Sequence, residues 1–247
     1  MSPKIIELLE ELFAIGGNHD AMRTFEIRNK FLELLREEHH LLALEDNEDA
    51  VLAKDAIYFI DAHHIYATTT DRTEAYLRIQ PIFERLMQAD GWNYYEIKFV
   101  ITSLSFTISL EQAIELGTKA VQRLLNFKVA NDADYIEGVL ACNMCSRILY
   151  AKYFDADVKL NLVEDFSLWL SKLKRLTEKE SKLEVGLLAT EIREAILNKN
   201  QEQIFKLLDK LESKYDKNVA NTISNEINSY LVSKKYNPLL HKGIFAS

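Results

Sequence analysis

Only three prolines and seven glycines occur among the 247 residues, and this scarcity constrains the fold more than any motif. An all-β protein needs many turns, and turns are built largely from these two residue types. Long helices joined by short connections need far fewer of them. Because 48% of the residues are hydrophobic, the chain can also form a continuous core without disulfide or metal staples. The composition therefore predicts an all-α fold.

Hydrophobic periodicity divides the chain into helical segments. The clearest segment follows Ser109, where apolar residues recur with the period of one helix face. Ser109 stands three residues before Gln112, and Asp71 stands three residues before Glu74, which is the spacing of N-terminal helix caps. The predicted helices span residues 4–15, 20–42, 47–67, 72–90, 92–107, 110–127, 132–154, 160–178, 181–198, 201–214 and 218–235.

Connections of a few residues leave no length for a crossover, so neighbouring helices are expected to be antiparallel. A helix pair then takes about 40 residues, the length of a repeat in helical arrays. This favours a tetratricopeptide-like α-solenoid over a compact bundle, although no strict repeat signature recurs. No linker rich in Gly, Pro or Ser is present, so we expect one domain over 1–247, with N-terminal helices at 1–46, a solenoid at 47–235 and a tail at 236–247.

The net charge of -8 and the pI near 5.4 exclude the basic footprint of a nucleic-acid-binding protein. No apolar run approaches the ~18 residues of a membrane span, and the N-terminus lacks the pattern of a secretory leader. These features predict a cytoplasmic protein that contacts neither nucleic acid nor membrane.

Two short patterns raise the possibility of a metal site. Glu37 with His40, and Asp61 with His64, place a carboxylate and an imidazole one helical turn apart. Bundle sites that hold two metal ions also need glutamates from two further helices, and none stands out on an apolar face. A Gly-rich phosphate loop and a G-x-S-x-G elbow are both missing. We therefore expect no enzyme, no metal and no cofactor, and a metal-dependent helical enzyme is the less favoured alternative.

Cys142 and Cys145 form a C-x-x-C pair inside the predicted helix 132–154. A zinc site needs two more ligands, and a redox pair favours a helix N-terminus that stabilises its thiolate. Neither condition holds in the middle of an apolar helix. Buried, reduced thiols are the expectation.

The segment GWNYYEIKFV places an acidic side chain in an aromatic stripe. Trp92, Tyr95, Glu96 and Phe99 fall at i, i+3, i+4 and i+7 and would share one face of a helix. We expect Gly91 to end one helix, Trp92 to begin the next, and the stripe to pack in the core. A buried carboxylate must be paired, so Glu96 should cap a neighbouring helix start or meet an arginine. Contact between this stripe and a ligand is the alternative.

The stretch from GWNYYEIKFV to AVQRLLNF resembles the C-terminal domain of Rgg/MutR-type transcription regulators, which carry a W-x-x-Y-E pattern. Trp92, Tyr95 and Glu96 carry the match, and ADYIEGVLACNMCSRIL resembles an apolar helix of that family interrupted by an asparagine. By helix order the likeness covers residues 47–235. It implies a tetratricopeptide-like solenoid, a homodimer, and a cytosolic sensor of short imported peptides.

The N-terminal part departs from this family. Family members begin with a helix-turn-helix domain of five short helices, whereas 1–46 hold one short and one long predicted helix. The long helix mixes basic and acidic side chains, which suits a scaffold better than a recognition helix. We expect no direct DNA binding by this chain alone. Either it is a freestanding sensor, or a DNA-binding reader lies outside the chain.

The predicted helix 132–154 supplies the candidate peptide site. Between Gly138 and Leu149 its strongly polar side chains are Asn143, Ser146 and Arg147, with the first and last one turn apart. The predicted function is a regulatory module that binds a short apolar peptide through these residues. Two alternatives stay open: that these polar groups bond only to neighbouring helices, and that the chain is a helical-repeat scaffold for another protein.

Overall fold

The computed structural model describes residues 1–15, 21–37, 47–69, 71–127, 132–155, 161–215 and 217–233. Within these ranges every regular element is a helix and no strand forms, which confirms the all-α prediction. The chain divides into two compact units, Met1–Ile108 and Ser109–Ser247. The sequence alone predicts one domain, because no linker marks this division.

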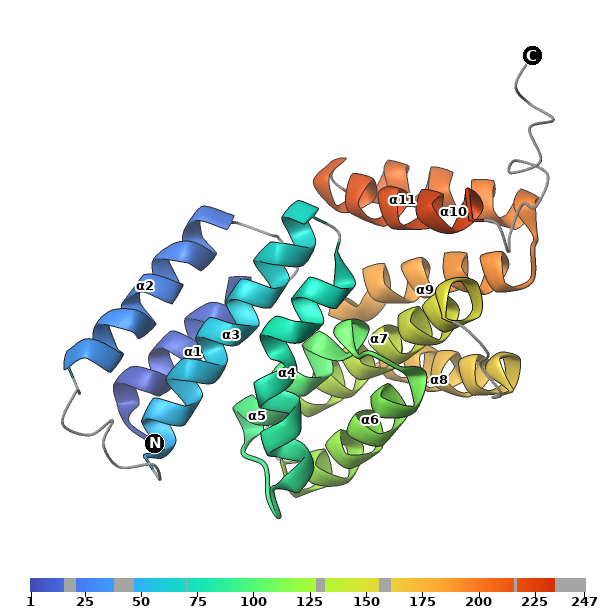
Figure 1. Ribbon diagram of the computed structural model, residues 1–247. Coiled ribbons are helices and arrows are strands. Elements are labelled where there is room, and N and C mark those ends of the chain that lie inside the picture. The colour runs from blue at the N-terminus through green and yellow to red at the C-terminus, as the bar shows by residue number, and fades with distance from the viewer. Residues whose placement is uncertain are drawn as a thin grey trace. The chain divides into compact units, whose positions relative to one another are not determined.

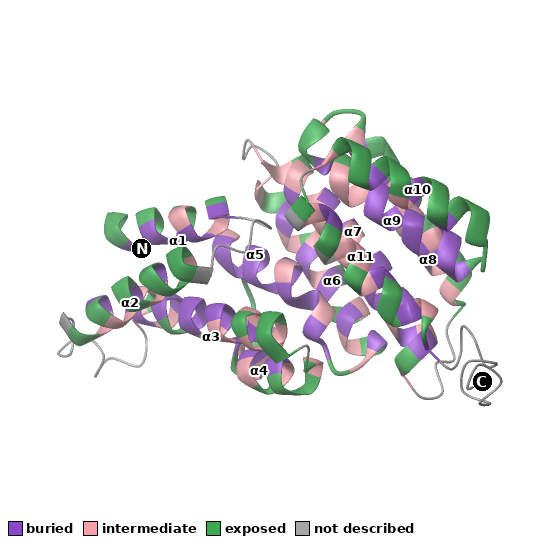
Figure 2. Ribbon diagram, turned by 90° about the horizontal axis from the view of Figure 1, so that it is seen from above, coloured by how far each residue is buried: buried purple, intermediate pink, exposed green. Residues whose placement is uncertain are grey.

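Unit 1 is built from helices that pack against their neighbours in chain order (Figure 1). They are α1 (Pro3–Ile15), α2 (Ala21–Glu37), α3 (Glu48–Thr69), α4 (Arg72–Gln88) and α5 (Tyr94–Ser103), the last followed by the 3-10 turn η2 (Leu104–Phe106). Helix α3 touches α1, α2, α4 and α5, and many of its residues are buried (Figure 2). It is therefore the central helix of this unit.

Unit 2 continues the pattern of sequential packing. Its helices are α6 (Leu110–Leu124) with the 3-10 turn η3 (Leu125–Phe127), α7 (Ala133–Phe154), α8 (Leu162–Thr177), the 3-10 turn η4 (Ser181–Leu183), α9 (Glu184–Leu197), α10 (Gln201–Lys214) and α11 (Lys217–Leu231). Helix α7 is buried along most of its length and packs on α6, α8 and α9 (Figure 2).

Both predicted caps form. The Asp71 carboxylate accepts from the backbone N–H groups of Thr73 and Glu74, at 2.8 and 3.0 Å, and starts α4. The Ser109 hydroxyl accepts from the N–H of Gln112 at 3.2 Å and starts α6. These side chains satisfy N–H groups that have no partner within the helix.

The predicted boundary at Trp92 is wrong. Helix α4 ends at Gln88 rather than at Gly91, and Asn93 is the N-cap of α5. Asn93 Oδ1 accepts from the N–H of Glu96 at 3.0 Å, and Glu96 Oε2 accepts from the N–H of Asn93 at 2.7 Å. This reciprocal pair is a capping box. Trp92 therefore precedes the helix, and its indole N–H donates to the carbonyl of Leu86 at 2.8 Å.

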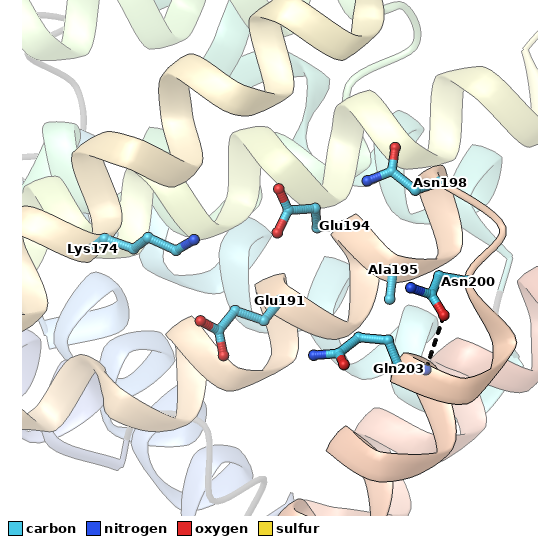
Figure 3. A pocket seen from close by; sticks show the side chains of 7 residues that line it. All are labelled: Lys174, Glu191, Glu194, Ala195, Asn198, Asn200 and Gln203. Atoms are coloured by element: carbon cyan, nitrogen blue, oxygen red, sulfur yellow. Dashed lines mark hydrogen bonds between the residues drawn. The ribbon is translucent and has the colours of Figure 1, made fainter.

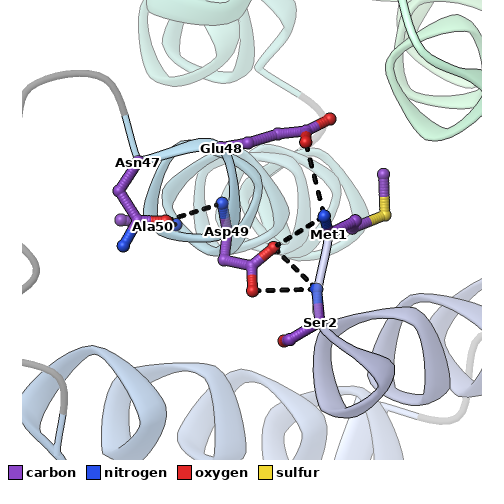
Figure 4. A network of polar contacts seen from close by, with 6 residues as sticks. All are labelled: Met1, Ser2, Asn47, Glu48, Asp49 and Ala50. Carbon is purple, nitrogen blue, oxygen red and sulfur yellow. Dashed lines mark hydrogen bonds and ion pairs between the residues drawn. The ribbon is translucent and has the colours of Figure 1, made fainter.

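The start of the chain binds to the start of α3. The backbone N–H of Ser2 donates to both carboxylate oxygens of Asp49, at 3.0 and 2.9 Å, and the Met1 amino group lies 3.5 Å from Glu48 Oε2 (Figure 4). Asn47 Oδ1 accepts from the N–H of Asp49 at 3.0 Å and caps α3. Together these contacts fix the beginning of α1 against α3.

Two glycines allow close packing on α7 in unit 2. A Cβ at Gly138 would lie 2.2 Å from Leu183 Cδ1, and a Cβ at Gly186 would lie 2.7 Å from Cys142 Sγ. Real side chains do not approach so closely, so any larger residue at either position must displace its neighbour. Among the described residues, no helix is both long enough and apolar enough to cross a membrane.

Candidate functional site

The three predicted peptide-binding residues lie inside unit 2. On α7 the exposed fractions of Ser146 and Arg147 are only 7% and 1%, while Asn143 is half-buried. Ser146 donates from its hydroxyl to Glu226 Oε1 at 3.3 Å. Arg147 Nη2 lies 2.7 Å from Asp155 Oδ2, at the C-terminal end of the same helix. Arg147 is therefore paired with the C-cap residue of its own helix.

Glu226 on α11 joins three helices. Arg193 on α9 donates to it through Nε and Nη2, at 3.0 and 2.6 Å, and Tyr230 donates from its hydroxyl at 3.4 Å. Burial works to lower the pKa of Arg193, but the charge of Glu226 and the hydrogen bonds to it raise this pKa above its ordinary value. The fixed positive charge of Arg193 therefore holds Glu226 beside Ser146.

These contacts agree with the alternative in which the polar groups of α7 bond to neighbouring residues of the chain. They give the Ser146 hydroxyl and Nη2 of Arg147 partners inside the chain. Peptide contact with Asn143, Ser146 and Arg147 stays a prediction.

A different part of unit 2 forms an open pocket of about 400 Å³ where α8, α9 and α10 meet (Figure 3). Two carboxylates, one ammonium group and three amides line it. The lining residues are Lys174, Glu191, Glu194, Ala195, Asn198, Asn200 and Gln203.

One stripe of α9 forms a wall of this pocket. Glu191, Glu194, Ala195 and Asn198 follow the spacing i, i+3, i+4 and i+7, which places them on one helix face. Arg193 lies off this stripe and points toward α11, where it meets Glu226. Helix α9 therefore presents the pocket on one side and the buried ion pair on another.

The turn from α9 to α10 sets the far edge of the pocket. Lys199 adopts a left-handed backbone conformation with φ of 54°. The N–H of Lys199 bonds to the carbonyl of Ile196 at 3.0 Å, and the N–H of Asn200 bonds to that of Ala195 at 2.9 Å. This left-handed residue closes α9. Asn200 Oδ1 then accepts from the N–H of Gln203 at 3.1 Å and starts α10 (Figure 3).

Helix α7 supports the same turn. Lys152 Nζ donates to the carbonyl of Leu197 at 2.9 Å, and the hydroxyl of Tyr153 donates to the carbonyl of Ile196 at 3.1 Å. Burial, and then the charge of Lys199, lower the pKa of Lys152. Lys152 and Tyr153 thus bind the C-terminal end of α9, next to Asn198 and Asn200.

The pocket residues do not follow from sequence reasoning, since most of them are ordinary polar surface residues that come from three different helices. One local signal was present. The string NKNQ at 198–201 follows an apolar helix and supplies residues suited to a C-cap and an N-cap. It predicts a tight turn, but the pocket requires the packing of α8 as well.

Asp61, the carboxylate of one half of the metal pattern, is paired with arginines. Asp61 accepts hydrogen bonds from Arg28 Nε at 2.6 Å and from Arg78. Burial works to raise the pKa of Asp61, but the bonds and charges of these two arginines lower it. His63 packs against aromatic rings, with its ring centroid 4.3 Å from that of Phe59. No group of three candidate ligands occurs in the described ranges. The other half of the pattern pairs Glu37 with His40, and His40 lies outside the described ranges.

The cysteines are free thiols. Cys145 is buried, as expected, and Cys142 is half-buried. Burial raises the pKa of Cys142 to about 11 and raises that of Cys145 further. Because the thiolate is the reactive form, both side chains should be inert near neutral pH.

The aromatic motif of unit 1 is buried. The exposed fractions of Trp92, Tyr95, Glu96 and Phe99 are at most 8%. Glu96 Oε1 lies 2.6 Å from Arg85 Nη1, so the expected arginine partner is confirmed. Glu96 caps the N-terminus of its own helix, α5, instead of that of a neighbouring helix. This supports the structural interpretation of the motif over ligand contact.

Searches with this chain against protein-family models, curated proteins and solved structures find no match. The resemblance to Rgg/MutR-type regulators therefore stays a prediction from the residues that carry it.

Proposed function

We propose that the chain is a regulatory module of stacked helical hairpins, of the tetratricopeptide-like solenoid type, that binds a short peptide. The pocket of unit 2 carries this proposal, because amides from Asn198, Asn200 and Gln203 surround one concave site. The resemblance to Rgg/MutR sensor domains independently favours a peptide ligand.

Amide side chains suit a peptide because an extended backbone presents N–H and C=O groups that need partners once they lose water. Each Asn or Gln amide can donate and accept at once. A volume of about 400 Å³ lies at the lower end of ligand sites, so the pocket would hold a few residues. The apolar side chains expected of the peptide would lie outside this polar hollow.

Helix α9 offers a route from the pocket to the rest of unit 2. Its stripe with Glu191 and Glu194 faces the pocket, while Arg193 bonds to Glu226 and Glu226 accepts from Ser146. A peptide that displaces α9 would alter these bonds. On this proposal the polar residues of α7 respond to the ligand and need not touch it.

Thermal unfolding and titration calorimetry with a library of short peptides test the function. A ligand that binds only the folded state raises the melting temperature. For a peptide that binds, Asn198→Ala should weaken affinity by about 0.5–1.5 kcal/mol, the usual net value of a hydrogen bond. Asn228→Ala is the matched control, because Asn228 is exposed on α11 outside the pocket.

Two outcomes would change the assignment. If Asn143→Ala or Arg147→Ala weakens binding while Asn198→Ala does not, the peptide occupies the α7 residues. If no peptide binds, the sensor function fails and the protein-interaction scaffold replaces it. Light scattering on the same samples tests the homodimer that the resemblance implies.

A further inference from the structure

The pocket contains two carboxylates for which the described part of the chain supplies no partner. Among the described residues, Glu191 and Glu194 form no ion pair and no side-chain hydrogen bond. Three other acids of unit 2 are paired: Glu137 with Lys172, Glu226 with Arg193 and Asp155 with Arg147. Both pocket carboxylates are half-buried, so a cation can reach them from solvent.

The charges around the pocket favour a cation. The ends of α9 and α10 meet here, and their dipoles place opposite partial charges of about half a unit side by side, so these largely cancel. The charged side chains therefore determine the sign of the charge at the pocket. Among the lining side chains, Glu191 and Glu194 outweigh the single ammonium of Lys174, while Lys152 and Lys199 lie at the turn that borders the pocket.

The geometry matches a planar group with several donors. Glu191 and Glu194 lie one turn apart on α9, and Figure 3 shows their carboxylates on the same side of the helix as Lys174, with Gln203 beyond them. A guanidinium has five N–H donors and can bond to two acceptors at once, whereas an ammonium acts as a point charge. Amide oxygens of Asn198 and Gln203 supply further acceptors nearby.

We propose that this pocket recognises an arginine side chain of the bound peptide, with Glu191 and Glu194 as its acceptors. This inference rests on the proposed peptide-binding function and adds the specificity of the site. The amides of Asn198, Asn200 and Gln203 bind the backbone on either side of that arginine.

The test uses a labelled alanine–glycine peptide with one central arginine, and the same peptide with citrulline or glutamate in its place. Citrulline keeps the shape of arginine and removes its charge. By fluorescence anisotropy, the arginine peptide should bind about tenfold or more tightly than the citrulline peptide, since charge-assisted bonds are roughly twice as strong as neutral ones. Added salt should reduce this difference.

Variants of the protein test whether Glu191 and Glu194 cause the preference for arginine. Glu191→Gln and Glu194→Gln should each reduce the preference for arginine, and the double variant should abolish it. Glu212→Gln removes the same charge from an exposed position of α10 outside the pocket and should leave the preference intact. Far-UV circular dichroism verifies that each variant stays folded.

Three results would overturn the inference. Equal binding of the arginine and citrulline peptides refutes the specificity while the peptide-binding function stands. Equal loss with Glu212→Gln assigns the effect to the overall negative charge of the chain. Tighter binding of the glutamate peptide assigns recognition to Lys174. If neither these peptides nor the peptide library binds, the proposed function fails together with the inference.

Discussion

Replacing Asp55 with asparagine should change how the stability of unit 1 depends on pH. Asp55 is 4% exposed on α3 and accepts from Arg85, which also donates to Glu96 Oε1 at 2.6 Å. Two buried carboxylates thus share one guanidinium. Burial raises the pKa of Asp55 from 3.8 to about 7; the charge and hydrogen bond of Arg85 oppose this rise, and the charge of Glu96 adds to it.

The direction of the effect follows from where the proton binds. Between its ordinary pKa and about 7, Asp55 holds a proton in the folded chain and loses it on unfolding. The free energy of unfolding therefore contains a contribution that is present at low pH and disappears as pH rises through about 7. Each pKa unit corresponds to about 1.4 kcal/mol, so this contribution falls by about 2–3 kcal/mol between pH ~5 and pH ~8.

Asp55→Asn lacks the titrating proton, so its stability should not show that fall. The measurement is urea unfolding of both proteins at the two pH values, with the difference in unfolding free energy compared between them. Trp92 in unit 1 and Trp169 in unit 2 are the two tryptophans of the chain, so a Trp169→Phe background makes fluorescence report on unit 1. Asp90→Asn is the control, since Asp90 is exposed.

A difference between wild type and Asp55→Asn that is the same at both pH values would refute this reasoning. Arg85 would then outweigh burial, and Asp55 would be ionised throughout the range. A carboxylate that is stabilised as an anion would give this same result, because it would be ionised in the folded and the unfolded chain at both pH values. The measurement does not depend on the peptide proposal.

Further expected outcomes concern backbone and packing in both units. Gly138→Ala should destabilise it by about 1–3 kcal/mol, because the new Cβ would overlap the Leu183 side chain, whereas Gly91→Ala should have little effect since nothing lies within 4 Å. Chemical denaturation measures both. Lys199→Gly should stabilise unit 2 by up to about 1 kcal/mol, because relief of the left-handed conformation outweighs the added freedom of glycine in the unfolded chain. A lower unfolding midpoint for this variant would contradict that expectation.

The elements that sequence predicted well are those fixed by short-range signals. Helix periodicity located α3, α7 and α10 within a few residues, and the caps at Asp71 and Ser109 are confirmed by their hydrogen bonds. The error at Trp92 was avoidable. The string NYYE carries the capping-box spacing from Asn93 to Glu96, and this signal outranks the aromatic periodicity at a helix start.

Partners across helices were not predictable in the same way. An arginine partner for Glu96 was expected because a buried carboxylate needs one, but its identity as Arg85 depends on how α4 packs on α5. Asp155 lies two turns beyond Arg147 and was within reach of sequence reasoning. Glu226 lies far along the chain from Ser146, and its approach depends on where α11 docks.

The polar residues of α7 can be recognised in the sequence, whereas the residues of the pocket cannot. Sequence reasoning favours polar residues that stand out against an apolar background, and Ser146 and Arg147 do so because they are buried. Such residues are the ones most in need of internal partners, and the structure supplies them with Glu226 and Asp155. A ligand instead requires groups left unsatisfied at an accessible hollow. On an exposed helix face these look like ordinary surface residues until α8, α9 and α10 bring them together.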